Sequence, residues 1–174
     1  VHIKIDSGMN RLGVKSREEF YKMLYVFRNT SVKLTGIYTH FAHCADKEFT
    51  DTQFEEFLFY VAKAKRIFPY VKAHCASSAA IFTDDRYHLD MVRPGINLYG
   101  YCAQAAGAKG IALKPAMEVF SNVVCVKKAQ KNESIGYCRA YKTDRDIYYA
   151  VIGAGYGDGY KRGLSNKAAV YINK

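Results

Sequence analysis

The sequence predicts an α/β fold followed by a β-rich segment. Through residues 1–100, short runs of β-branched and aromatic residues alternate with longer runs whose apolar residues share one helical face. Beyond residue 110, strand-like runs follow one another with glycine-rich turns between them. Because the four β units of the first part cannot close a barrel of eight strands, we interpret the chain as the second half of a (β/α)8 barrel followed by part of a C-terminal β domain.

The first β unit is expected over Val1–Asp6, where apolar and polar residues alternate. A Ser-Arg-Glu-Glu capping box at residues 16–19 then predicts the start of a helix. Its apolar stripe has helical spacing and consists of Phe20, Met23, Leu24 and Phe27. The second strand is expected within Val32–His40.

A second capping box, Thr-Asp-Thr-Gln at residues 50–53, predicts another helix that ends before Pro69. Its apolar stripe consists of Phe54, Phe57, Leu58 and Val61. Strand-like residues return at 71–74, a short helix is expected within 77–82, and the last strand of the series is expected at 88–92.

A stretch of small residues at 103–110 predicts a linker. We therefore expect residues 1–110 to form the barrel part and residues 111–174 to form the first part of the β domain. Within the latter, the β-branched and aromatic content favours strands at 117–127 and 147–152.

Composition narrows the functional class. The chain has 174 residues with 49% apolar content, enough for a packed core. The five cysteines are odd in number and include no Cys-x-x-Cys pair, so we expect reduced thiols in a cytoplasmic protein. The net charge of +10 is spread along the chain without an aromatic and basic recognition module, so no nucleic-acid partner is expected.

The residues of this chain include no charged and then apolar leader segment and no apolar run of about 20 residues, so no membrane association of this fragment is expected. Both ends lie in or next to strand-like runs. We therefore expect the chain to be an internal fragment of a longer protein.

The segment Arg93-Pro94-Gly95-Ile96 follows the last expected strand and combines a fixed cation with a rigid turn and exposed amides. Parallel α/β folds bind ligands at this end of their strands, so the turn predicts an anion cradle. Ser78 follows the preceding strand and can complete a two-loop phosphate cup, although an ordinary helix N-cap explains its position equally well.

Two further loops carry polar groups. Arg11 lies in a glycine-rich loop after the first strand, where a surface arginine is the simpler interpretation. The loop after the second strand contains residues of metal-ligand type, namely His40, His43, Cys44 and Asp46. Their spacing matches no known metal site, so we predict a positioned, hydrogen-bonding histidine and no metal.

The second part of the chain is rich in glycine and tyrosine. The run at residues 153–159 lacks the βαβ unit and the helix that a dinucleotide loop needs, so tight turns are expected there. With 15 tyrosines in the chain, composition does not single out a catalytic one.

Six sequence blocks in this order resemble the alanine racemase family of pyridoxal-phosphate (PLP) enzymes, which have a (β/α)8 barrel followed by a β domain. The resemblance covers essentially the whole chain. The blocks are Lys4-x-Asp-Ser-Gly-Met-x-Arg-x-Gly, Thr39-His-Phe-Ala, His74-x-x-x-Ser-Ala-Ala, Arg93-Pro-Gly-Ile-x-x-Tyr-Gly, Leu113-Lys-Pro-Ala and Gly155-Tyr-x-Asp-Gly.

The resemblance assigns Arg93 to the pyridine nitrogen of PLP. A guanidinium does not give up a proton, so the ring nitrogen stays unprotonated and the cofactor is a weaker electron sink. The resemblance assigns the phosphate to Ser78 and to the amides of Gly95 and Ile96. It assigns Arg11 to the phenolic oxygen of PLP.

The resemblance also implies that Lys4 matches a lysine that is carbamylated in many members of the family. It implies that Tyr137 is a catalytic base acting across a homodimer interface, with Tyr141 as the weaker candidate. An ordinary tyrosine, with a pKa near 10, needs nearby positive charge to act as a base at neutral pH. The resemblance implies that His40 would pass the influence of Arg93 to the catalytic tyrosine. The family's Schiff-base lysine matches no residue of this chain, so the fragment alone is expected to be inactive.

The implied reaction is the interconversion of L- and D-alanine by two-base proton transfer, which supplies D-alanine for cell-wall peptidoglycan. Serine racemases of the vancomycin-resistance type share these blocks and stay an alternative. A non-catalytic PLP-binding barrel of cofactor homeostasis is a second alternative, but it would lack a β domain with Tyr137. A phosphate-binding barrel acting on sugars or nucleotides is a third, and it would not explain Arg93 and Tyr137 together. The sequence departs from the family at His43, Cys44 and Cys138.

Overall fold

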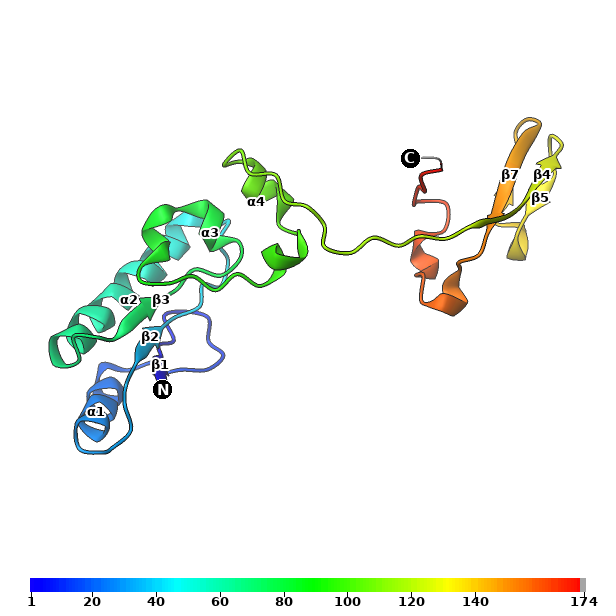
Figure 1. Cartoon of the computed structure of the whole chain (residues 1–174). Coiled ribbons are helices and arrows are strands. Elements are labelled where there is room, and N and C mark those ends of the chain that lie inside the picture. Colours follow the sequence, from blue (N-terminus) through cyan, green and yellow to red (C-terminus); the bar gives the residue numbers. More distant parts are fainter. Residues whose placement is uncertain (173–174) are drawn as a thin grey trace. The chain divides into compact units, whose positions relative to one another are not determined.

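The computed structural model describes residues 1–172, apart from the side chains of residues 103 and 104. The chain divides into two compact units, Val1–Met117 and Glu118–Lys174. The colours of Figure 1 distinguish the two units along the chain. The boundary that the sequence suggests after residue 110 stays a prediction.

Three parallel strands form the sheet of the first unit, in the order β1 (His2–Lys4), β2 (Gly36–Tyr38) and β3 (Lys72–His74). Helices α1 (Arg17–Arg28) and α2 (Lys47–Ile67) connect them. The strand and helix alternation expected from the sequence is therefore confirmed for this part, with strands shorter than the apolar runs that predict them.

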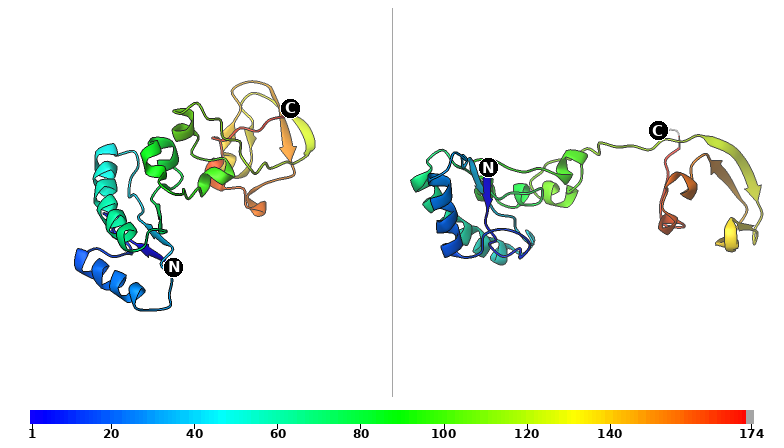
Figure 2. Two further views of the ribbon diagram at one scale, coloured as in Figure 1. Left: turned by 60° about the vertical axis from the view of Figure 1, so that its left-hand side comes forward. Right: turned by 90° about the horizontal axis from the view of Figure 1, so that it is seen from below.

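One face of the sheet is apolar and the other is polar. Ile3, Ile37 and Ala73 lie level with one another, and all three are buried. Both helices cover this face, as the two views of Figure 2 show. Since side chains alternate between the faces of a strand, the neighbouring positions point to the opposite face. They are His2, Lys4, Gly36, Tyr38, Lys72 and His74.

Helix α1 begins where the sequence predicts. The Ser16 hydroxyl accepts a hydrogen bond from the Glu19 amide at 3.1 Å, and the Glu19 carboxylate accepts one from the Ser16 amide at 3.4 Å. Phe20 and Leu24 of the predicted stripe are buried against the sheet. The first capping box is therefore confirmed.

Helix α2 begins earlier than the sequence predicts, so the second capping box is wrong. Asp46 is the N-cap, and its carboxylate accepts the Phe49 amide at 3.0 Å. Thr50 lies inside the helix, where its hydroxyl donates to the His43 carbonyl at 3.0 Å. Asp is at least as good a cap as Thr, and a start at Lys47 adds about one turn of helix.

The expected strand at residues 88–92 does not form. Asp85–His88 is a 3₁₀ turn, η1, and Leu89 has a positive φ of 48° that interrupts an extended backbone. The segment still runs alongside β3 and the residues after it. The Asp90 amide donates to the Ala73 carbonyl at 3.0 Å, and the Arg93 amide donates to the Ala76 carbonyl at 2.9 Å. Arg93 is therefore held beside the carboxyl end of β3.

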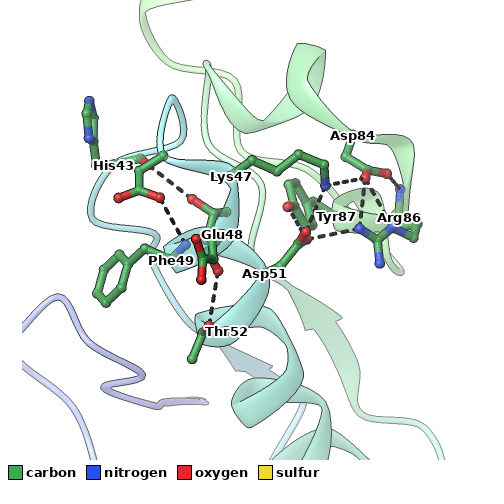
Figure 3. A network of polar contacts seen from close by, with 11 residues as sticks. His43, Lys47, Glu48, Phe49, Asp51, Thr52, Asp84, Arg86 and Tyr87 are labelled. Carbon is green, nitrogen blue, oxygen red and sulfur yellow. Dashed lines mark hydrogen bonds and ion pairs between the residues drawn. The ribbon is translucent and has the colours of Figure 1, made fainter.

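A polar network fastens the η1 turn to the start of α2 (Figure 3). The buried Tyr87 donates its hydroxyl proton to Asp51 at 2.6 Å. Arg86 and Lys47 bind the same carboxylate at 2.9 and 2.8 Å. Asp84, which caps η1, also contacts both cations at 3.0 and 3.4 Å. This network fixes the segment that leads to the next loop.

Short helical turns follow in the first unit. Helix α3 (Ala80–Thr83) lies at the end of the expected 77–82 helix. Helix α4 (Ala103–Gly107) occupies part of the stretch from which a linker was expected, because alanines favour helix where no other signal competes.

In the second unit, β4 (Val123–Ala129) pairs antiparallel with β7 (Ile147–Ile152), and β5 (Ser134–Ile135) pairs antiparallel with β6 (Tyr141–Lys142). The prediction for β7 is confirmed, whereas β4 begins six residues later than the expected start at 117. Residues 153–159 form turns that include η4 (Tyr156–Asp158), as expected. No helix among residues 1–172 is long and apolar enough to cross a membrane.

Candidate functional site

Arg93 lies at the carboxyl ends of β2 and β3, where five acceptors surround its guanidinium. One terminal nitrogen donates to His74 Nδ1 at 2.6 Å and to the His74 carbonyl at 3.2 Å. The other donates to the Thr39 carbonyl at 2.9 Å, to His40 Nδ1 at 3.2 Å and to the Cys75 carbonyl at 3.3 Å. The sequence predicts Arg93 and His40 as site residues, and the structure brings them together.

The hydrogen bonds to Arg93 identify which tautomer each of the two histidines adopts in the structure. A guanidinium can only donate, so His40 and His74 each accept through Nδ1 and keep their proton on Nε2. Burial and the nearby charge of Arg93 lower the pKa of His74 from 6.5 to about 4. The pKa of His40 is also lowered, mainly by burial and then by Arg93. Both imidazoles are therefore neutral at physiological pH.

Sequence reasoning included His74 only as part of a motif and did not give a role to His2. The structure places His74 Nε2 2.8 Å from His2 Nδ1 and stacks the His74 ring on Tyr38, with centroids 5.0 Å apart and an angle of 4°. Arg93 also lies over the Tyr38 ring, 5.2 Å from its centroid. The alternation of polar side chains along the strands indicates that these residues share one face of the sheet, but not which of them are in contact.

The two loops of the predicted phosphate cup contact each other in the structure. The Gly95 amide donates to the Ser78 hydroxyl oxygen at 2.9 Å, and the 3₁₀ turn η2 (Ile96–Tyr99) starts directly afterwards. A β-carbon at Gly95 would lie 3.6 Å from the Ser78 oxygen and would partly fill the cradle. Asn97 was not predicted, and its side-chain nitrogen donates to the Ser78 carbonyl at 3.2 Å.

Lys4 and Arg11 lie near the same site. Lys4 ends β1, and its pKa is lowered first by burial and then by the charge of Arg11. The loop that carries Arg11 is shaped by the Asp6 carboxylate, which accepts the amides of Gly8 and Asn10 at 3.2 and 2.9 Å. Arg11 also contributes to the lowered pKa of His40, so the predicted cations share one electrostatic environment.

The residues of metal-ligand type after β2 serve other roles. Asp46 caps α2, and the His43 carbonyl accepts from Thr50. Burial raises the pKa of the Cys44 thiol. Within residues 1–172 the structure contains no cluster of three or more histidine, cysteine or acidic side chains with metal-binding geometry.

The predicted catalytic tyrosine lies in the second unit. Tyr137 begins the turn η3 (Tyr137–Arg139) and is 84% exposed. Cys138 and Arg139 follow with φ values of 57° and 54°, so the backbone turns sharply after the tyrosine. Tyr141 instead lies in β6, opposite Ile135. The role of Tyr137 stays a prediction.

Comparisons with known proteins show what the whole chain is similar to. The curated alanine racemase of Chlorobaculum tepidum is 40% identical over 174 residues, and that of Clostridium tetani is 35% identical over 179 residues. These matches cover 99% and 100% of this chain but 45% and 46% of the relatives, so the chain spans a little under half of their length.

Solved structures give the same result. Alanine racemase from Clostridium difficile 630 matches with a TM-score of 0.77 and 32% identity, covering 92% of this chain and 44% of that one. Alanine racemase from Bacillus anthracis with bound L-Ala-P matches with a TM-score of 0.72 and 30% identity, covering 94% and 44%. The expected fold class, part of a (β/α)8 barrel followed by part of a C-terminal β domain, is confirmed.

Family models describe almost the whole chain. The model described as alanine racemase, N-terminal domain, matches residues 1–103. The model described as alanine racemase, C-terminal domain, matches residues 116–174. The chain therefore belongs to the alanine racemase family.

Proposed function

We propose that the protein containing this chain is a PLP-dependent racemase that interconverts L- and D-alanine. The observation that carries the proposal is the position of Arg93 between two neutral histidines, beside a cradle for an anion. The cofactor supplies one piece of chemistry when bound, the withdrawal of electrons that makes the α-proton of an amino acid acidic. The residues of this chain bind, orient and exchange protons around it.

The donors at Arg93 suit a pyridine nitrogen. Its two terminal nitrogens are occupied by His74, His40 and backbone carbonyls, whereas its Nε proton has no acceptor among the described residues. An uncharged ring nitrogen is an acceptor and matches this remaining donor. Arg93 would then hold that nitrogen unprotonated.

The cup at Ser78 suits a phosphate. The Ser78 oxygen accepts from Gly95, which leaves the hydroxyl proton available to an anion. The first amides of a helical turn have no partners inside the turn, and at η2 these include the amide of Ile96. Gly95 leaves the cradle open because it has no side chain.

Proton transfer is the second part of the proposal. Tyr137 acts as the base on one face of the substrate, in the site of the partner subunit of a homodimer, and His40 links it to the positive charge of Arg93. An ordinary tyrosine needs such a charge to act near pH 7. Lys4 orients Arg11, which binds the phenolic oxygen of the cofactor. We also infer that the enzyme is cytoplasmic.

The test uses the holoenzyme that contains this chain. We expect bound PLP, detected by its visible absorbance, and racemisation of L-alanine in preference to L-serine. Tyr137→Phe should slow proton exchange on one face of alanine at least about 100-fold, whereas the control Tyr141→Phe should leave it unchanged. A protein without PLP would refute the proposal. Normal exchange on both faces in Tyr137→Phe would refute the role of Tyr137, and a preference for serine would change the substrate.

A further inference from the structure

A chain of hydrogen bonds leaves the candidate site on the side away from His40. Arg93 donates to His74 Nδ1 at 2.6 Å, and His74 Nε2 lies 2.8 Å from His2 Nδ1. Because Arg93 can only donate, His74 carries its proton on Nε2 and donates it to His2. His2 must then accept through Nδ1. Each link has one donor and one acceptor.

His2 reaches His74 across an intervening strand. Strands β1 and β3 do not pair with each other, because β2 lies between them. Gly36 of β2 is level with His2, and a β-carbon there would overlap the His2 ring, 2.6 Å from its Cγ. Only the absence of a side chain at Gly36 allows His2 to lie over β2. The contact therefore depends on two positions that local sequence patterns do not connect.

The contact matters because a neutral histidine has two tautomers. With the proton on Nε2, His74 accepts from Arg93. With the proton on Nδ1, the imidazole of His74 and the guanidinium of Arg93 would point protons at each other, and their 2.6 Å hydrogen bond would be lost. His74 is 3% exposed, so water does not replace a missing partner. An acceptor at His2 selects the tautomer that Arg93 requires.

We propose that His2 is a positioning residue for Arg93, because it fixes the tautomer of His74 that holds the guanidinium. His2 does not contact the reacting atoms itself. The Tyr38 ring stacks on His74 and prevents the imidazole from turning away. The structural part of the inference concerns residues of this chain alone, and only its kinetic part rests on the proposed racemase function.

The first experiment measures the tautomer directly. In ¹⁵N-histidine spectra of the holoenzyme that contains this chain, we expect His74 to carry its proton on Nε2. His2→Leu removes the acceptor and should give a mixture of His74 tautomers. His2→Gln retains an acceptor oxygen and should restore the Nε2 form. The control His88→Leu changes a histidine that contacts the Ile81 carbonyl and should leave His74 unchanged.

The second experiment measures the consequence for catalysis. His2→Leu should lower kcat for alanine about tenfold with little change in KM, as expected for one lost positioning hydrogen bond. His2→Gln should restore most of the wild-type kcat. Gly36→Ala displaces the His2 ring and should resemble His2→Leu. The double variant Gly36→Ala/His2→Ala relieves the overlap and should fold well while keeping the mixed tautomers, which separates positioning from folding.

Two results distinguish failure of this inference from failure of the proposed function. An unchanged His74 tautomer in both His2→Leu and the double variant would overturn the role of His2, even in an active racemase. A protein that shifts the His74 tautomer as expected but binds no PLP would support the role of His2 and refute the racemase proposal.

Discussion

Acidification should destabilise the folded state through His74. The imidazole is 3% exposed, and its pKa falls from 6.5 to about 4, first through burial and then through Arg93. Between these values the unfolded chain binds a proton that the folded chain does not. The contribution of His74 to stability is therefore complete above pH 6.5 and is lost as the pH falls toward 4.

The magnitude follows from the change in pKa. At about 1.4 kcal/mol for each pH unit, the fall from 6.5 to about 4 makes unfolding about 3 kcal/mol easier at pH 4 than at pH 7. The pKa of His40 is lowered too, so it adds an effect of the same sign. A variant is needed to separate the two histidines.

The assay is urea unfolding of the holoenzyme that contains this chain, at pH values from 4 to 7. His74→Gln can still accept from Arg93 and donate to His2, but it does not titrate. The difference in unfolding free energy between wild type and His74→Gln should change by about 3 kcal/mol across this range. His88→Gln serves as the matched control. A difference that stays constant from pH 4 to 7 would show that His74 is not held neutral.

Three further predictions concern the elements that support the site. Tyr87→Phe removes the 2.6 Å hydrogen bond to Asp51 but keeps the ring contacts, so urea unfolding should show a loss of about 1–3 kcal/mol; no loss would mean that the network in Figure 3 does not stabilise the fold. Asp46→Ala removes the N-cap of α2 and should cost about 1 kcal/mol, whereas Thr52→Ala, an exposed position in the same helix, should cost less than about 0.5 kcal/mol; equal losses would contradict the observed helix start. Gln53→Met removes the acceptor of the Ala42 amide, at 3.0 Å, together with a buried side-chain nitrogen that has no partner among residues 1–172 as described. That amide should exchange hydrogen faster without a loss of stability, and unchanged exchange would refute the role of Gln53 in holding the His40 loop.

Local signals predicted the elements where they had no competitor. The Ser16 capping box and the strand at Ile147–Ile152 were found because their cues lie within a few adjacent residues. The second capping box was wrong because Asp46 offered a better cap just upstream. The strand expected at residues 88–92 was wrong for two reasons. Leu89 has a positive φ, and only a few hydrogen bonds join this segment to β3 and the residues after it.

The residues of the candidate site also differ in whether local sequence signals predict them. Arg93, Ser78 and Gly95 could be predicted because each lies in a compact motif at the end of a β unit. His2 and Gln53 could not, because their contacts depend on the register of strands and on the approach of a helix to loops distant in sequence. No pattern within a single segment connects His2 with Gly36 and His74.

The contacts of Arg93 to His74 and to His40 differ in length and in burial. His74 lies at 2.6 Å, is buried, and is supported by both His2 and the Tyr38 ring. His40 lies at 3.2 Å and is only half-buried. The short, enclosed contact fixes the direction of the guanidinium, whereas the longer contact to the half-buried His40 holds it less tightly. Because both histidines must accept from Arg93, protonation of either one would remove a contact that orients the cation.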